Sequence, residues 1–132
     1  MENLKLLEVV AAAILRDGKV FAASRGYGNY RGWWEFPGGK IEAGESSEAA
    51  LQREIFEELR VSVVVGDLVG LVEYDYPEFR VRMRCYFCEI VGGELEVLEH
   101  EDWRWLDAEN LYDVKWLPSD LALLDEIAKR LN

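Results

Sequence analysis

The sequence predicts one α/β domain over residues 1–132, built on a β-sheet with two main helices. Three observations predict this fold class. The chain has 132 residues, of which 50% are hydrophobic, and this is enough apolar material for one core. Several short segments rich in β-branched and aromatic residues lie between Gly, Pro and Asp turns, which is typical of strands. Two other segments carry apolar residues at helical spacing.

The first third of the chain predicts a hairpin followed by a loop. Residues 9–15 and 20–24 are expected as the two strands, with Asp17-Gly18 as the turn, although the alanine run in the first segment leaves a helix possible. Residues 26–32 hold three glycines and two tyrosines without periodicity and are expected as a loop. Residues 34–39 are expected as a short extended segment that ends in a Pro-Gly-Gly turn.

The clearest predicted helix covers residues 46–59. Its apolar residues Leu51, Ile55 and Leu59 fall at positions i, i+4 and i+8, so they lie on one face. Ser46 is a suitable N-cap, because its hydroxyl can accept a hydrogen bond from the first turn.

The second half of the chain predicts a run of strands and a closing helix. The strands are expected at residues 61–65, 68–76, 79–91, 94–98 and 103–106, and the helix at residues 119–131 with Leu121, Leu124, Ala128 and Leu131 facing inward. In the third of these strands, apolar residues from Val81 to Phe87 alternate with Arg80, Arg82, Arg84 and Tyr86. The alternation predicts one buried face and one face that meets solvent or a ligand.

Charge and cysteine content exclude several classes of function. The 15 basic and 26 acidic residues give a net charge of −11, which disfavours binding to nucleic-acid polymers and to anionic membranes. If the ligand is itself an anion, a divalent cation has to lie between the two negative partners. Cys85 and Cys88 are expected on opposite faces of one strand, as reduced core thiols rather than zinc ligands. The apolar stretch at residues 6–15 is too short to span a bilayer, so we expect an untargeted cytoplasmic protein.

Three carboxylates are crowded on the helix at residues 46–59. Glu54, Glu57 and Glu58 lie at i, i+3 and i+4, and like charges at this spacing cost roughly 0.2–0.5 kcal/mol per pair. Only Arg53 lies close by in sequence to compensate them. A solvated acidic face would explain the pattern, but the Gly38-Gly39 pair before the helix offers carbonyl oxygens that can converge with the carboxylates. Hard oxygen ligands of this kind favour Mg²⁺ or Mn²⁺ and a role in phosphate chemistry.

These residues also resemble a known family motif. Gly39, Glu45 and the segment at residues 53–61 match the Nudix box, G-x5-E-x7-R-E-U-x-E-E-x-G-U with U aliphatic, except that Arg60 occupies the position of the last glycine. Flanking segments are similar to the MutT-like branch, including residues 35–40, Glu99, Trp105 and residues 117–120. The resemblance implies a Nudix-type α/β/α sandwich with a mixed, mainly antiparallel sheet and two main helices. We expect Arg60 to adopt the left-handed conformation or to end the helix differently, at a cost of about 1 kcal/mol and without loss of activity.

The resemblance implies an Mg²⁺-dependent hydrolase, with Mn²⁺ as a substitute, that cleaves nucleoside triphosphates to a monophosphate and pyrophosphate. The implied substrates are either oxidised purines such as 8-oxo-dGTP or cytidine nucleotides, CTP or dCTP. The implied metal ligands are the Gly38 carbonyl and the carboxylates of Glu54, Glu57, Glu58 and Glu99. Family members use either Glu54 or a later glutamate as general base, and we favour Glu99 in that role.

The same resemblance implies roles for further residues. Arg53 would orient a catalytic carboxylate, while Glu45 and Gly39 would support the loop before the helix. The implied substrate contacts are Arg25 and Lys40 at the phosphates, and Glu35, Tyr76, Phe79 and Asp120 around the base. The adjacent His100 is interpreted as a bystander.

Two alternative functions remain open from the sequence. One is a non-catalytic Nudix domain that senses nucleotides or binds a protein, although such a domain would be expected to have lost a metal ligand. The other is hydrolysis of a different nucleoside diphosphate derivative such as ADP-ribose. The oligomeric state, monomer or homodimer, is also open.

Overall fold

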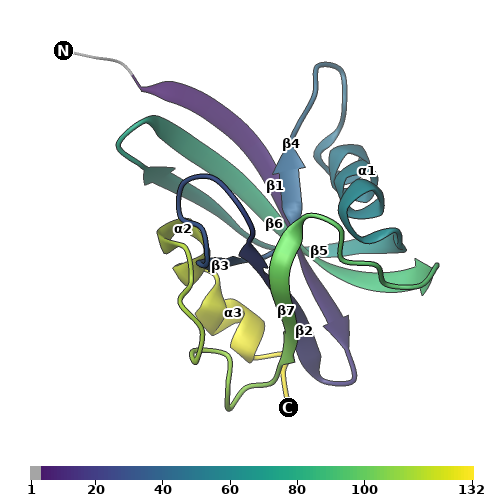
Figure 1. Cartoon of the computed structure of the whole chain (residues 1–132). Helices are drawn as coiled ribbons and strands as arrows, with labels where there is room; N and C mark the ends of the chain where they lie inside the picture. Colours follow the sequence, from purple (N-terminus) through teal and green to yellow (C-terminus); the bar gives the residue numbers. More distant parts are fainter. Residues whose placement is uncertain (1–3) are drawn as a thin grey trace.

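A computed structural model describes residues 4–132, and over this range the chain forms seven strands and three helices (Figure 1). In chain order the elements are β1 (Lys5–Arg16), β2 (Lys19–Arg25), β3 (Trp34–Glu35), β4 (Gly38–Lys40), α1 (Ser47–Leu59), β5 (Ser62–Asp75), β6 (Phe79–Gly92), β7 (His100–Leu106), α2 (Pro118–Leu121) and α3 (Leu124–Ala128). Within residues 4–132, every helix is too short or too polar to cross a membrane.

The strands form a mixed sheet in which antiparallel pairing dominates, as predicted. The order is β3-β2-β1-β6-β5, with β4 paired to β1 and β7 paired to β2. Only the central pair, β1 with β6, is parallel among the strands described. The hairpin between β1 and β2 turns at Asp17 and Gly18, whose φ angles of 53° and 74° are the left-handed values that a tight hairpin turn requires.

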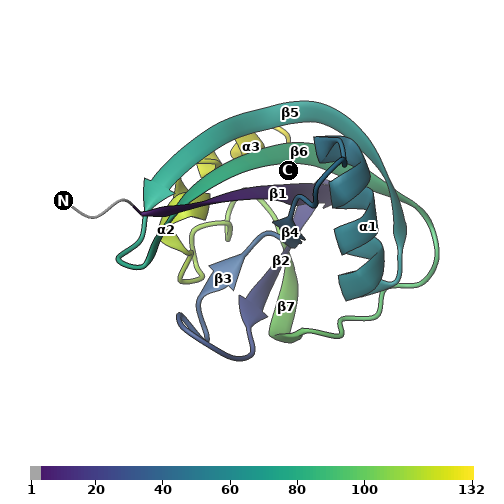
Figure 2. The same ribbon diagram turned by 90° about the horizontal axis from the view of Figure 1, so that it is seen from above.

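Helices cover both faces of this sheet, so the fold is the α/β/α sandwich (Figure 2). The alternation of β1 separates two cores. Val10 and Ile14 pack on the side of α1, while Ala11 and Ala13 pack on the side of α2 and α3. Strand β6 divides in the same way, because Cys85 lies in the second core and Cys88 in the first. Both cysteines are buried free thiols on opposite faces, as predicted.

Helix α1 begins and ends where the sequence predicted. The Ser46 hydroxyl accepts a hydrogen bond from the Ala49 N–H at 3.1 Å, and Leu51, Ile55 and Leu59 are fully buried. The helix ends at Arg60, which adopts φ 59° and ψ 26° and donates its backbone N–H to the Phe56 carbonyl. Arg60 therefore takes the left-handed conformation that the box glycine would supply.

Two predicted boundaries within the sheet are wrong. Residues 37–39 were expected as a turn, but residues 38–40 form β4 and pair with β1. A Cβ atom on Gly38 would lie 1.9 Å from the Val10 carbonyl oxygen, so only glycine allows this close approach. Residues 61–65 and 68–76 were expected as two strands, but they form the single strand β5, in which Gly66-Asp67 lies at a bulge.

Two predictions toward the C-terminus are also wrong. Residues 94–98 form no strand, because their backbone N–H groups at Glu96 and Leu98 bond instead to the carbonyls of Leu59 and Glu58 at the end of α1. The single closing helix is replaced by α2 and α3, separated by a turn in which the Leu123 N–H bonds to the Asp120 carbonyl. That turn leaves Leu121 exposed, against the prediction that it faces inward.

Candidate active site

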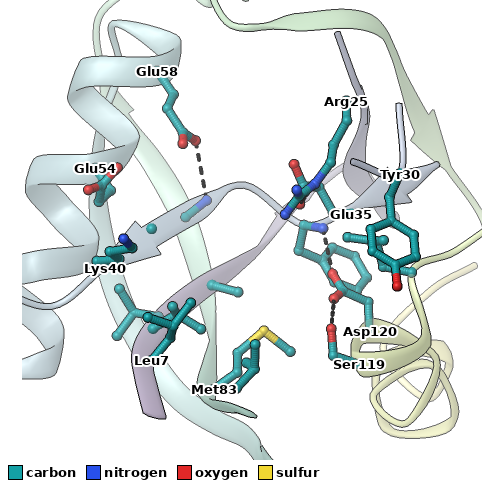
Figure 3. A pocket seen from close by; sticks show the side chains of 18 of the residues that line it. Leu7, Arg25, Tyr30, Glu35, Lys40, Glu54, Glu58, Met83, Ser119 and Asp120 are labelled. Atoms are coloured by element: carbon teal, nitrogen blue, oxygen red, sulfur yellow. Dashed lines mark hydrogen bonds and ion pairs between the residues drawn. The ribbon is translucent and has the colours of Figure 1, made fainter. Parts of the chain in front are cut away.

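A pocket of about 480 Å³ lies between α1 and α2, and strands β1 and β6 form its floor (Figure 3). Leu7 and Met83 give the floor an apolar surface, while acidic side chains stand at both ends. Polar groups thus frame an apolar cavity, an arrangement typical of small-molecule sites.

The α1 end is formed by Glu54 and Glu58, one helical turn apart. Glu58 is buried, and its Oε2 accepts a hydrogen bond from the Gly38 N–H at 3.2 Å. Burial raises the pKa of Glu58 to about 9, and the negative charges of Glu54, Glu35 and Glu99 add to this effect. Burial also raises the pKa of Glu54, although Arg53 opposes the shift. Excess negative charge at this end would be relieved by a cation.

Glycine at position 39 leaves room for the carboxylate of Glu54. A Cβ atom built on Gly39 would lie 2.3 Å from Cδ of Glu54, so any larger residue would displace that side chain. The Glu54 carboxylate therefore rests directly against strand β4. This contact explains in physical terms why the motif begins with glycine.

Arg53 ties α1 to the loop that precedes it. Its Nε and Nη2 form a forked pair with Glu45 at 2.8 and 2.9 Å, and Nη2 also donates to the Lys40 carbonyl at 3.1 Å. Its Nη1 donates to Glu54 Oε1 at 2.9 Å and lies 3.4 Å from both oxygens of Glu57. Pairing with Arg53 lowers the pKa of Glu45 to about 2. A forked guanidinium pair of this kind holds geometry better than a lysine would.

The predicted metal ligands are only partly brought together. Glu54, Glu58, Glu99 and Gly38 all line the pocket, but Glu57 lies outside it beside Arg53, with 54% of its side chain exposed. No three acidic, His or Cys side chains within residues 4–132 surround one point suitable for a metal ion. The donor set nevertheless fits a hard divalent cation, because it offers carboxylate and carbonyl oxygens in a region of surplus negative charge.

The α2 end is centred on Asp120, which is 3% exposed. Its Oδ2 accepts a hydrogen bond from the Phe36 N–H at 2.9 Å, and its Oδ1 accepts one from the Ser119 hydroxyl at 3.0 Å (Figure 3). Burial raises the pKa of Asp120 to about 7, and the charge of Glu35 contributes to the rise. Tyr76 shares a hydrogen bond of 2.9 Å with the same Ser119 hydroxyl. The acid is thus held within a buried polar network.

Glu35 lies beside this network and has two side-chain partners. Arg25 donates from Nε to Glu35 Oε1 at 3.1 Å, and Nε2 of His100 lies 3.2 Å from Glu35 Oε2. Arg25 lines the pocket as predicted, but its Nε is engaged by Glu35, so its contact with phosphate stays a prediction. His100, interpreted as a bystander, lies in the pocket wall and contacts Glu35.

Aromatic and basic side chains complete the wall. Tyr76 and Phe79 line the pocket with ring centroids 5.3 Å apart, and Lys40 lines it beside α1. Several further lining residues were not predicted as site residues, among them Tyr30, Met83 and Ser119. The alternation in β6 placed Met83 on the apolar face, and it is this face, not the arginine face, that lines the pocket. No local signal indicated Tyr30, whose position depends on how the loop after β2 folds back toward Tyr76.

Comparison with known proteins supplies independent information on this arrangement. The family described as NUDIX domain matches residues 6–127. A protein of Mycobacterium tuberculosis named "Putative 8-oxo-dGTP diphosphatase 2" is 39% identical over 128 residues, which cover 94% of this chain and 89% of that protein. The CTP pyrophosphohydrolase of Escherichia coli strain K12 is 35% identical over 123 residues, which cover 92% of this chain and 91% of that protein.

Solved structures with the same fold cover nearly the whole chain. The solution structure of the E. coli ORF135 protein superposes with a TM-score of 0.81 at 33% identity, covering 96% of this chain and 91% of that one. The crystal structure of a MutT NUDIX hydrolase from Burkholderia pseudomallei superposes with a TM-score of 0.84 at 26% identity, covering 92% of this chain and 98% of that one. The architecture and the sequence therefore indicate the same relationship.

Proposed function

Because the chain belongs to the NUDIX family and is a Nudix hydrolase, we propose that it hydrolyses nucleoside triphosphates to a nucleoside monophosphate and pyrophosphate. Its substrates would be oxidised nucleotides such as 8-oxo-dGTP, or the cytidine nucleotides CTP and dCTP. Two relatives that match almost end to end carry names for these two activities. The function is one of sanitising the nucleotide pool.

One observation carries the proposal most directly. The pocket has a carboxylate-rich end at α1 and a second, separate acidic end at Glu35 and Asp120, with an apolar floor between them. A nucleoside triphosphate has matching parts, since its phosphates need cations and its base offers amino groups to acceptors. The arrangement therefore supports a ligand that extends from one end to the other.

The phosphate end requires a divalent metal, which Nudix hydrolases use in general. We propose Mg²⁺, with Mn²⁺ as a substitute, held by the Gly38 carbonyl, Glu54, Glu57, Glu58 and Glu99. When bound, the ion would screen the charge of the triphosphate and make an attacking water more acidic. It would also reconcile an anionic substrate with a protein of net charge −11.

The chain's own residues would position and activate the reacting groups. Arg53 holds Glu54 by a charge-assisted hydrogen bond and is itself held by Glu45, so the carboxylate has little freedom to turn away. Glu99 forms no side-chain hydrogen bond within the part of the chain described, and it lines the pocket, so it is free to accept the proton of the water. Lys40 and Arg25 would contact phosphate oxygens.

The base end would select groups that donate hydrogen bonds. Glu35 and Asp120 present carboxylate oxygens, which suit an exocyclic amine or a protonated ring nitrogen. Cytosine and guanine derivatives both offer such an edge, which is consistent with both substrate classes. Tyr76 and Phe79 would pack against the base.

We propose a cytoplasmic enzyme that acts as a single domain over residues 1–132, as a monomer or homodimer. Its surplus of acidic residues disfavours partners such as nucleic-acid polymers or anionic membranes.

The test is a nucleotide panel with Mg²⁺, comprising 8-oxo-dGTP, dGTP, CTP, dCTP and ADP-ribose, with pyrophosphate and orthophosphate measured separately. We expect pyrophosphate release from 8-oxo-dGTP or the cytidine nucleotides, and its loss in Glu57→Gln. Glu48→Gln is the matched control, because Glu48 is an exposed acid on the first turn of the same helix. Absence of pyrophosphate from every nucleotide would refute the proposed hydrolysis, and full activity in Glu57→Gln would refute the proposed metal role of Glu57.

A further inference from the structure

A bulge at the start of β7 determines which side chain faces the pocket. Strand β7 pairs with β2, and β3 pairs with the other edge of β2, so the three strands lie side by side (Figure 2). Ser24 lies opposite Asp102, but the next residue, Arg25, lies opposite His100, so Glu101 is an extra residue in β7. Without this bulge Glu101 would lie opposite Arg25. Bulges beside binding sites commonly redirect a side chain in this way.

The redirected His100 ring has one polar contact. Its side chain is only 5% exposed, and Nε2 lies 3.2 Å from Glu35 Oε2. Its Nδ1 is buried and has no hydrogen-bond partner within residues 4–132. Because the Glu35 carboxylate accepts, Nε2 must carry the hydrogen and donate it. Packing alone does not require Nε2 to point at a carboxylate. The hydrogen bond to Glu35 is therefore the polar interaction that this ring orientation serves.

The two donors hold both oxygens of one carboxylate. Arg25 binds Oε1 of Glu35 from β2, and His100 binds Oε2 from β7 across that strand. A carboxylate has about four acceptor positions, so two remain for a ligand. Held at both oxygens, the group loses little freedom when it accepts a further hydrogen bond.

We propose that His100 is a positioning residue that orients Glu35 toward an amino group of the nucleobase, and so contributes to base selectivity. This inference rests on the proposed hydrolysis of nucleotides and identifies a residue on which its selectivity depends. Under the proposed function the phosphates extend from Arg25 toward α1, away from the base. The role of His100 therefore concerns substrate binding rather than the chemical step.

The experiment compares His100→Leu with His100→Gln, using the preferred nucleotide of the panel and its nearest competitor. Leucine removes the donor, whereas the amide of glutamine extends far enough to replace Nε2–H. We expect His100→Leu to raise KM for the preferred nucleotide about tenfold, the scale of one hydrogen bond to a charged group, with kcat changed less than about twofold. His100→Gln should restore KM to within about threefold of wild type.

A double-mutant cycle and a spectroscopic measurement make the test independent of simple destabilisation. In a Glu35→Gln background, His100→Leu should have little further effect on KM, because the group it orients is already altered. His100 is the single histidine of the chain, so its ¹⁵N resonances can be assigned directly. We expect the tautomer with hydrogen on Nε2 in the wild-type protein without nucleotide.

Three results would overturn the inference alone while the wild type remains active. They are equal KM values for His100→Leu and the wild type, an undiminished effect of His100→Leu in the Glu35→Gln background, and hydrogen on Nδ1 in the neutral ring. If the wild type releases pyrophosphate from no nucleotide, the proposed function fails and the inference fails with it. The two failures are therefore distinguishable in one set of assays.

Discussion

The two ends of the pocket are both acidic, but they are assembled in different ways. At the α1 end, Glu54 and Glu58 lie one turn apart on a single helix, and Arg53 of the same helix holds one of them. At the α2 end, the backbone N–H of Phe36 bonds to Asp120, a residue 84 positions away in the sequence. One end depends on local helical geometry, while the other depends on the packing of the whole domain.

Because of this difference, the chemistry shared by all nucleotides and the selection of one base over another depend on separate parts of the pocket. The local end is proposed to handle the triphosphate, which is the same in every nucleotide. The assembled end is proposed to contact the base, which differs among nucleotides. Changes at the α1 end should therefore affect all substrates alike, and changes at the α2 end should affect them unequally.

The largest expected effect comes from Glu58→Gln, which replaces a buried carboxylate with an amide of similar shape. The amide oxygen can still accept the Gly38 N–H, but a proposed metal ligand loses its charge. We expect kcat to fall by about 100- to 1000-fold for every nucleotide, since metal ions contribute several kcal/mol to such reactions. Initial rates across the panel measure this.

A loss confined to one nucleotide would contradict the expectation that changes at the α1 end affect all substrates alike. The melting temperature in EDTA provides the control for folding. Burial and like charges disfavour the Glu58 carboxylate, so the substitution should not lower the stability of the metal-free protein.

The equivalent change at the other end is Asp120→Asn, which should alter base preference more than turnover. An amide offers a donor as well as an acceptor, so the ratio of kcat/KM between two bases should shift about tenfold. Equal losses on all bases would contradict this prediction.

Asp120→Asn should also remove a pH dependence of stability. Burial raises the pKa of Asp120 from an ordinary 3.8 to about 7, so between these values the unfolded carboxyl loses its proton while the folded one keeps it. The unfolded state then binds fewer protons, and the free energy of unfolding falls as pH rises, by on the order of 4 kcal/mol in total. Stability from this group is complete below about pH 4 and lost above about pH 7. Urea unfolding at pH 5 and pH 8 should show a smaller difference in the variant than in the wild type.

The same contrast explains how far the sequence could predict the molecule. The cap at Ser46, the apolar face of α1 and the crowding of Glu54 and Glu58 were predictable, because helical spacing places them without knowledge of the rest. The α/β class and the alternation in β6 followed from periodicity in the same way. Such patterns depend on neighbours within a few residues.

Features set by distant contacts could not be predicted in this way. Strand β4 forms because Gly38 can approach the backbone of Val10 closely. The local Pro-Gly-Gly pattern fits a turn equally well, so it does not indicate this pairing. The contact of His100 with Glu35 depends on a bulge between two strands, and a bulge has no signal in one strand alone. The closing helix is divided by a turn that buries Leu123 and Leu124 together.

A further prediction tests how the α1 end is held together. Arg53→Lys keeps the positive charge but cannot reproduce the forked pair with Glu45 or the simultaneous contact with Glu54. Loss of such a supporting contact typically weakens metal binding 10- to 100-fold. The Mg²⁺ concentration that gives half-maximal activity should therefore rise, and full turnover should return at high Mg²⁺.

Arg31→Lys is the control, because Arg31 pairs with Glu101 on the exposed surface outside the pocket. It should leave the Mg²⁺ dependence unchanged. If the defect of Arg53→Lys persisted at saturating Mg²⁺, Arg53 would act on the substrate itself, and the division between holding and reacting groups at this end would be wrong.

The smallest expected effect is at Arg60, where the family pattern has glycine. Arg60 is held at φ 59°, and a left-handed conformation costs a non-glycine residue about 1 kcal/mol or more. Arg60→Gly removes that cost but adds freedom to the unfolded chain and loses the stacking of the guanidinium over Phe56. We expect Arg60→Gly to gain roughly 0.5 kcal/mol in unfolding free energy. The unfolding free energy of Arg60→Asn should lie between those of the wild type and Arg60→Gly, and kcat should be unchanged in both variants. Because Arg60 ends α1 outside the pocket, a change in kcat would mean that the last position of the motif takes part in the chemistry rather than only in ending the helix.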